Sequence, residues 1–280
     1  MITAFHPEDR SVSGPGAILN LLRRNRIRVE HRYCDSVVLK SITYERFRGQ
    51  INWTSVDRFI GSSRGRILCR EGVELPCERG YRRFASDELS RRMCENAALY
   101  LLRDPETTGA GVVLIDDDGE YTGLCSYLVE ENDHVTVITK NPRLYLREAD
   151  RLLEEKGAVI GIAKGIEPLK NADLILAPAP LMRDLHCPED AVILSAVAPT
   201  VAQNAPVIWD YSFELPEKYS ALKPDYLDDM YFASAMFTLA GAHELGSSVF
   251  RRCTDGSVIH TRQSLTEKLK KRLAGRCAVI

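Results

Sequence analysis

Six short apolar runs, closed by residues such as Gly, Pro, Asn and Asp, lie between residues 111 and 211. Two helix-length segments separate the first three runs. An apolar strand with no polar alternation must be buried on both faces, so helices have to cover both sides of the sheet. The pattern predicts an α/β fold with a doubly wound, mostly parallel sheet. The six runs are residues 112–115, 135–139, 158–163, 173–177, 191–197 and 206–209.

The first hundred residues lack this alternation and predict a smaller N-terminal α+β domain. A short helix is expected over 17–24 and a hairpin over 66–75, with its turn at Glu71-Gly72. From Ser86, a favourable N-cap, apolar residues recur every four positions and predict a helix leading into the sheet domain. The pattern gives three segments: an N-terminal α+β domain (1–105), a sheet domain (106–215) and C-terminal helices packing back across both (216–280).

Two helices are expected after the sixth run. Residues 227–245 are apolar and rich in small side chains, which predicts a buried helix. Ser264 and Glu267 have the spacing of a capping box that opens an amphipathic surface helix, which Gly275 would end.

Composition narrows the class of protein. The chain has 280 residues, 45% of them apolar, and its N-terminus carries no apolar core behind a basic cap, so we expect a cytoplasmic protein without a membrane span. Eight cysteines are scattered with no C-x-x-C pair, which favours reduced structural thiols and no metal site. The last four residues, from Cys277, loosely match a prenylation signal, but the final isoleucine is atypical of it.

Charge is strongly segregated along the chain. Residues 1–103 carry 19 Lys+Arg against 12 Asp+Glu, residues 104–230 carry 10 against 24, and residues 231–280 carry 8 against 3. Lys40 is the single lysine of the first segment, and arginine forks onto carboxylates and phosphates. We favour docking of the basic segment on the acidic one and treat nucleic acid as the less favoured partner.

The turn after the first run decides what the sheet domain could bind. Dinucleotide-binding folds place a glycine-rich turn there, because the backbone must approach a pyrophosphate held at a helix N-terminus. Here the turn spans residues 116–123, and it keeps Gly119 and Gly123 but carries four acids. Acidic side chains oppose a phosphate, so the turn is a poor phosphate cradle unless they point outward.

The end of the second run favours a particular cofactor. An acid there would bind the ribose of NAD, whereas basic and hydroxyl side chains suit the extra phosphate of NADP. The chain has Thr139, Lys140, Asn141 and Arg143 at this place. The alternative is that Lys140 and Arg143 are solvated loop charges and Asn141-Pro142 starts a helix.

Three stretches resemble the NADP-binding domain of shikimate dehydrogenases and glutamyl-tRNA reductases: Val137-Ile138-Thr139-Lys140-Asn141, residues 172–180, and a buried helix that returns after the last strand. The resemblance covers residues 111 to about 211 and implies a Rossmann-like domain with a degenerate glycine turn. It also implies NADP as cofactor. The cofactor-binding residues predicted from the resemblance and the strand ends are Gly119, Thr122, Gly123, Thr139, Lys140, Asn141, Arg143, Ala177 and Pro178.

Three groups near the expected strand ends could transfer protons: Lys164, Asp210 and Tyr211. With them the sequence predicts, as the first hypothesis, an NADP-dependent oxidoreductase acting on a small anionic substrate in an interdomain cleft. The second hypothesis is a non-catalytic ligand-binding or scaffold protein with a degenerate Rossmann-like domain. The third is nucleic-acid binding through the arginines of the first domain. Assembly as a homo-oligomer stays open.

Overall fold

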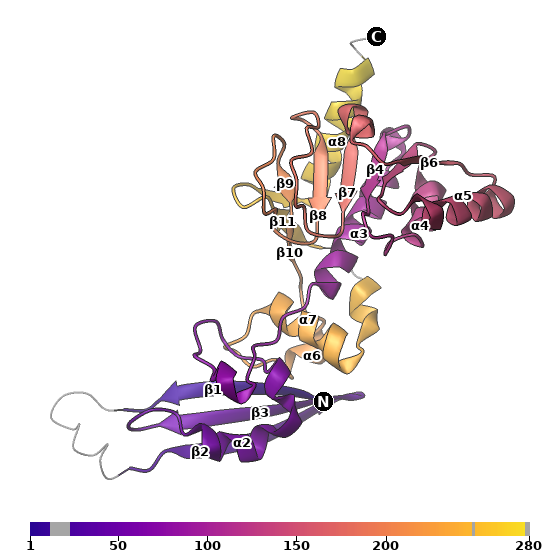
Figure 1. The fold of residues 1–280 in the computed structure, drawn as a ribbon. Coiled ribbons are helices and arrows are strands. Elements are labelled where there is room, and N and C mark those ends of the chain that lie inside the picture. The colour runs from indigo at the N-terminus through magenta and orange to yellow at the C-terminus, as the bar shows by residue number, and fades with distance from the viewer. Residues whose placement is uncertain (12–22, 248–249, 278–280) are drawn as a thin grey trace. The chain divides into compact units, whose positions relative to one another are not determined.

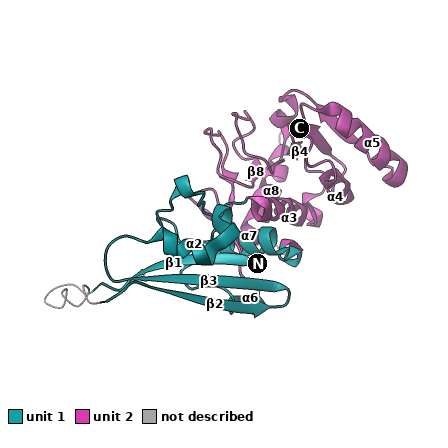
Figure 2. Cartoon of the chain, turned by 60° about the horizontal axis from the view of Figure 1, so that its bottom comes forward, with its two compact units in different colours: residues 1–86, 215–245 teal, residues 87–214, 246–280 magenta. Residues whose placement is uncertain are grey.

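The computed structural model describes residues 1–11, 23–247 and 250–277. The chain forms two compact units (Figure 2). The smaller unit comprises residues 1–86 and 215–245, and the larger unit comprises residues 87–214 and 246–280. The predicted helix over 17–24 falls largely outside the described residues, as does the side chain of Cys277.

The larger unit is built on a six-stranded sheet in which every pair of neighbours is parallel (Figure 1). Its order is β6-β5-β4-β7-β8-β9, so the chain starts in the middle, runs to one edge, returns and runs to the other. This is the Rossmann strand order, and the predicted α/β fold is confirmed. The strands are β4 (Val112–Ile115), β5 (Val135–Ile138), β6 (Ile160–Ala163), β7 (Leu174–Ala177), β8 (Val192–Ser195) and β9 (Val207–Ile208).

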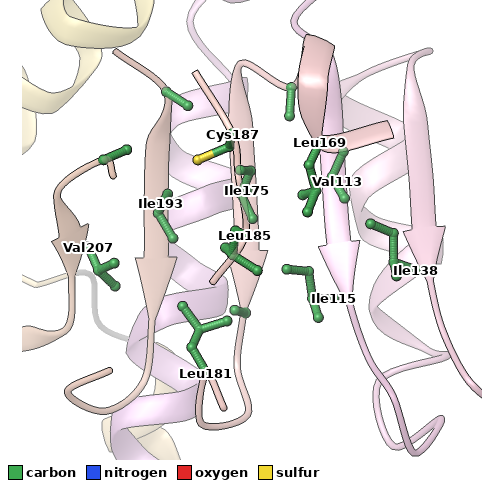
Figure 3. Close-up of a cluster of buried hydrophobic side chains, with 14 residues drawn as sticks. Val113, Ile115, Ile138, Leu169, Ile175, Leu181, Leu185, Cys187, Ile193 and Val207 are labelled. Carbon is green, nitrogen blue, oxygen red and sulfur yellow. The ribbon is translucent and has the colours of Figure 1, made fainter. Parts of the chain in front are cut away.

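Strand register aligns the core side chains in rows across the sheet. Val113 lies beside Ile175, Ile175 beside Ile193, and Ile193 beside Val207. Residues paired across neighbouring strands point to the same face of the sheet, so this row forms one continuous apolar surface. Leu181, Leu185 and Cys187 from the β7–β8 connection pack into the same cluster (Figure 3).

The two faces of the sheet are covered differently. Helices α3 and α8 pack against each other and against the sheet, and α4 contacts α3 and β5. On the face of Figure 3 the cover is the short helix η5 and the non-helical segment 178–191, rather than the full-length helices expected on both sides. The helices are α3 (Glu88–Leu102), α4 (Leu124–Glu131), α5 (Pro142–Lys156), α8 (Arg262–Cys277), η4 (Pro105–Thr107) and η5 (Glu167–Asn171).

One buried carboxylate ties the C-terminal helix to the sheet. Asp173, just before β7, is fully buried and accepts a hydrogen bond from the Gly111 N–H at 2.8 Å. It also pairs with Arg272 Nε at 3.1 Å and Arg276 Nη1 at 2.5 Å, both on α8. Apolar residues of α8 are buried as well, whereas residues 262–264 and 274–276 are exposed, so the helix is amphipathic, as predicted, with one face toward the sheet.

A second, antiparallel sheet of the larger unit has no counterpart in the sequence prediction. It has the order β10-β11-β12, with β10 (Asp210–Ser212), β11 (Arg252–Thr254) and β12 (Ile259–Thr261). Three-residue strands are too short for a period-2 pattern to stand out, and β10 and β11 are far apart in sequence.

The smaller unit has a three-stranded sheet of order β1-β3-β2, with β1 parallel and β2 antiparallel to β3. Phe5, Ile42 and Val56 are at the centre of its core, and α7 contacts β1 and β3. The elements are β1 (Ile2–Asp9), β2 (Arg26–Cys34), β3 (Val37–Arg46), α2 (Trp53–Ile60), η2 (Gly61–Arg66), η3 (Cys77–Arg79), α6 (Glu217–Ser220), α7 (Asp229–Ala240) and η6 (His243–Ser247).

Several local predictions are wrong in detail. Residues 66–75 do not form a hairpin, because Ile67 and Leu68 make isolated bridges to Arg83 and Ala4 instead. Helix α3 has Asp87 as its N-cap, not Ser86, and the apolar segment 227–245 breaks at Gly241, whose φ is +69°.

The capping box of α8 lies three residues earlier than predicted and Gly275 does not end the helix. Thr261 Oγ1 accepts from the Ser264 N–H at 3.2 Å, while Ser264 Oγ accepts from the Thr261 N–H at 2.9 Å. The reciprocal bonding satisfies the free N–H groups of the first turn. Within the described residues, no helix has the length and apolar content to cross a bilayer.

Candidate functional site

The candidate site lies in the larger unit, at the carboxyl ends of β4 and β7. These two strands are neighbours in the sheet, and the chain leaves them toward opposite edges, which makes the place between them the topological switch point where ligands bind in such sheets. A cavity of about 430 Å³, here called the switch-point pocket, opens there. It is lined by Ile115, Asp116, Asp117, Asp118, Glu120, Tyr121, Lys140 and residues 179–183.

Residues 116–123, here called the acidic turn, are folded around the carboxylate of Asp116. That side chain is only 2% exposed. Its Oδ1 accepts from the N–H of Gly119 at 2.9 Å and Glu120 at 3.1 Å, and its Oδ2 accepts from the Tyr121 N–H at 2.8 Å. The Tyr145 hydroxyl of α5 donates to Oδ2 at 2.5 Å. A single buried anion is thus satisfied by four donors.

The acidic turn therefore contains its own anion. Successive backbone N–H groups that converge on one point form an anion-binding nest, and in a dinucleotide-binding fold the pyrophosphate uses such groups. Here the N–H groups of Gly119, Glu120 and Tyr121 already bond to Asp116. The residues present do not fit a pyrophosphate at this turn.

Glycine is required at one position of the acidic turn. Gly119 has a φ of +81°, and an added Cβ would lie 2.5 Å from Cδ1 of Leu144. Gly123, the N-cap of α4, has a φ of −63° and open space around it. Of the two glycines predicted to bind cofactor, Gly119 shapes the turn and Gly123 has no such constraint.

The end of β5 is fastened to the acidic turn. Lys140 Nζ lies 2.6 Å from Asp117 Oδ2, and Arg183 Nη2 lies 3.3 Å from Asp117 Oδ1. The Asn141 side-chain amide donates to the carbonyl oxygens of Asp117 at 3.3 Å and Asp118 at 3.1 Å. Two of the groups predicted to receive the NADP phosphate, Lys140 and Asn141, are therefore engaged by the chain itself.

The remaining predicted cofactor residues are distributed around this edge. Thr139 is buried, and its hydroxyl accepts from the Asn141 N–H at 3.0 Å. Arg143 is exposed on α5, Thr122 precedes α4, and Ala177 ends β7 just before Pro178. The sequence analysis included Tyr121 in the turn and residues 179–180 in the resembling stretch without giving them a role, and it missed Tyr145 and residues 181–183. A lone aromatic residue on the inner side of α5 was the available signal for Tyr145.

Tyr121 lines the pocket, and its own hydroxyl is buried without a hydrogen-bond partner among the described residues. Burial raises the pKa of Tyr121 to about 12. Burial and the neighbouring Asp116 also raise the pKa of Tyr145 far above its ordinary value. Both phenols consequently stay protonated near neutral pH, and Tyr145 donates its hydroxyl proton to Asp116.

The three groups predicted for proton transfer are not brought together. Lys164 is exposed just after β6, whereas Asp210 and Tyr211 belong to β10 of the separate antiparallel sheet. The Tyr211 ring is 2% exposed, its hydroxyl donates to the Ile208 carbonyl at 3.3 Å, and burial raises its pKa well above the ordinary value. None of the three lines the switch-point pocket.

Comparison with known proteins adds little to what the strand order says about the fold. No protein-family model matches the chain, and no curated protein matches it. Among solved structures, the chain is similar to the L-tryptophan dehydrogenase from Nostoc punctiforme, with 12% identity, 97% of this chain and 80% of that chain covered, and a TM-score of 0.29. A TM-score this low supports no argument about function. The Rossmann-like assignment rests on the sheet itself, and the resemblance to shikimate dehydrogenases and glutamyl-tRNA reductases stays a prediction.

Proposed function

We propose that the chain is a Rossmann-like binding protein whose switch-point pocket takes a small molecule other than a dinucleotide. The observation that carries the proposal is the carboxylate of Asp116, which accepts the N–H groups of Gly119, Glu120 and Tyr121. A pyrophosphate would have to displace a buried, fully bonded anion that is covalently part of the turn. Such displacement breaks hydrogen bonds to a charged group, and each of these bonds contributes about 1.5–3 kcal/mol of stability.

The lining of the pocket suggests the chemistry of the ligand. Ile115, Leu181 and Met182 offer apolar contact, and Tyr121 adds an aromatic side chain. The charged lining groups besides Asp116 are three acids and two bases, and both bases pair with Asp117. The acids Asp118 and Glu120 are exposed. This balance favours a small neutral or amine-bearing molecule with an apolar part.

The role of Asp116 can be tested by chemical rescue. Asp116→Ala leaves the turn N–H groups buried and without their acceptor, so the melting temperature should fall, and acetate or pyrophosphate should raise it more in the variant than in the wild type. Asp118→Ala, at an exposed carboxylate of the same turn, is the matched control and should show no rescue. Equal responses of the two variants would contradict the assigned role of Asp116.

The ligand class is tested separately on the wild-type chain. Calorimetry with NADP, NADPH, NAD and NADH at millimolar concentration should give no binding heat, whereas a panel of small amines and neutral metabolites should contain compounds that raise the melting temperature. Met182→Ala should weaken the binding of such a compound, because Met182 lines the pocket with an exposed apolar side chain. Saturable NADPH binding to the wild type would overturn the proposal.

An NADP-dependent oxidoreductase is the second candidate. The strand order and the Thr139-Lys140-Asn141 sequence at the end of β5 support it. It requires that the Asp116 carboxylate give up its hydrogen bonds to the N–H groups of the turn and that Lys140 give up its ion pair with Asp117. NADPH binding that strengthens in Asp116→Ala, together with hydride transfer to a carbonyl compound, would select this candidate.

A further inference from the structure

Seven of the fifteen arginines of the smaller unit gather at one end of its sheet. Strand register brings together the end of β1, the start of β2 and the end of β3, with Asp9 opposite Arg46 and Arg26 opposite Glu45. Seven arginines occur in and next to these strand ends: Arg10, Arg23, Arg24, Arg26, Arg28, Arg46 and Arg48.

The acids at this end are already paired with some of these arginines. Arg10 pairs with Glu8 at 2.8 Å, Arg28 with Glu45 at 2.7 Å, and Arg46 with Asp9 at 2.8 Å. In the described part of the chain, Arg23, Arg24 and Arg26 form no salt bridge, and residues 12–22 contain no Asp or Glu. Three positive charges thus lack a counter-charge.

These three arginines line one cavity. It has a volume of about 760 Å³ and is formed by Arg23, Arg24, Asn25, Arg26 and Phe47, here called the arginine pocket. The described residues of its lining include no carboxylate. The Phe47 ring lies 5.5 Å from the Arg23 guanidinium carbon, in cation–π contact, and is only partly buried.

The floor of the arginine pocket is held in shape by Asn25. Its side chain accepts from the Phe47 N–H at 2.8 Å and donates to the Arg48 carbonyl at 2.9 Å and the Tyr44 hydroxyl at 3.1 Å. These bonds fix the aromatic ring beside the arginines. A preformed arrangement loses less conformational entropy when a ligand binds.

We propose that the arginine pocket binds single-stranded nucleic acid, with the arginines on phosphates and a base on Phe47. A positive groove with an aromatic side chain is the combination that single-strand binding uses, because each base offers a ring face for stacking. Arginine, unlike lysine, both forks onto phosphate and stacks on planar groups. Arg28 follows Arg26 two residues along β2, so the two side chains leave the strand on the same face about 7 Å apart. A duplex keeps its bases stacked on each other, so it offers none to Phe47.

The test is fluorescence anisotropy of the full chain with a short labelled oligouridine. Arg23→Ala/Arg24→Ala/Arg26→Ala should weaken binding at least about tenfold and reduce the slope of log affinity against log salt by about 2, since each phosphate contact contributes about 0.7. The control is Arg92→Ala/Arg103→Ala/Arg251→Ala, which removes the same charge from exposed arginines of the larger unit. It should bind as the wild type does.

A second variant separates stacking from charge. Phe47→Leu keeps an apolar side chain and the net charge, and should weaken oligouridine binding about fivefold or more without changing the salt slope. Circular dichroism and the melting temperature establish that each variant is folded. Unchanged affinity in folded Phe47→Leu would contradict the stacking contact.

Competition experiments identify the source of the anion. Unlabelled oligouridine should displace the probe, while equal phosphate concentrations of duplex RNA, inorganic phosphate or phosphatidylserine vesicles should not. The proposal is overturned if the wild type does not bind oligouridine, if both triple variants weaken binding equally, or if any of these three competitors displaces the probe as well as the single strand does.

Discussion

The acidic turn of the larger unit and the arginine pocket of the smaller unit treat charge in opposite ways. In the turn, Asp116 is bonded to backbone N–H groups and Asp117 to Lys140 and Arg183. In the pocket, Arg23, Arg24 and Arg26 have no carboxylate partner among the described residues. A charge that the chain satisfies itself contributes to folding, whereas a charge left without a partner at a cavity is available to a ligand. The same sequence property, segregated charge, therefore has two different meanings in the two units.

The largest expected effect concerns the buried carboxylate of the larger unit. Asp173→Asn leaves Arg272, whose side chain is only 15% exposed, without its buried counter-charge, and should lower the free energy of unfolding by about 3 kcal/mol. Asp190→Asn removes the exposed partner of the same arginine and should cost less than about 1 kcal/mol.

The measurement uses the two tryptophans, one in each unit: Trp53 and Trp209. In a Trp53→Phe background, fluorescence during urea unfolding reports on the larger unit alone. A loss for Asp173→Asn as small as that for Asp190→Asn would contradict the comparison, because the satisfied buried charge would then contribute little to the fold.

A smaller effect is expected from the two glycines of the acidic turn. Gly119→Ala must adopt a positive φ and contact Leu144, so we expect a loss of about 1–2 kcal/mol. Gly123→Ala has an ordinary φ and open space, and should be neutral or stabilising by up to about 1 kcal/mol. Urea unfolding followed at Trp209 compares them. If Gly123→Ala were the more costly, the turn would owe its shape to the helix start and not to Asp116.

The smallest expected effect is a pH dependence in each unit. Burial lowers the pKa of both His6 and His260 from 6.5. Glu8 raises and Arg70 lowers the pKa of His6, while Lys268 lowers and Asp255 raises that of His260. Because the unfolded chain binds the proton more tightly, each histidine should reduce stability as pH falls below about 6.5 toward its folded pKa.

Single-tryptophan variants assign the two pH effects. The free energy of unfolding is measured in urea between pH 7.5 and 5, where it falls by about 1–3 kcal/mol for each molar of urea. His6→Gln should flatten the pH dependence of this free energy reported by Trp53, and His260→Gln should flatten the one reported by Trp209. A pH dependence that survives in both variants would assign it to other groups.

The sheet of the larger unit could be predicted because its strands are buried on both faces. Residues 112–115 and 174–177 are apolar throughout and stand out from their neighbours. The cover of one face could not be predicted, because Leu181, Leu185 and Cys187 are spaced irregularly in a loop and give no period. The antiparallel sheet was missed because its partners, Tyr211 and Cys253, are distant in sequence.

The candidate site was predicted in location but not in arrangement. The acids of residues 116–118 were expected to oppose a phosphate, but nothing in the sequence shows that Asp116 points inward to the turn's N–H groups while Asp117 points to Lys140. That difference depends on the positive φ of Gly119 and on Tyr145, which comes from α5. Side-chain direction within a turn is a tertiary property, and single-residue patterns do not encode it.

The bonding of Asp116 has a consequence for how the larger unit responds to its surroundings. A carboxylate tethered to the backbone through a single methylene competes with any diffusing anion at an effective concentration of at least about a millimolar. A dissolved oxyanion must exceed that level before it can take its place. The loop after the first strand of the sheet should thus keep one conformation while the concentrations of phosphate and nucleotides around it rise and fall.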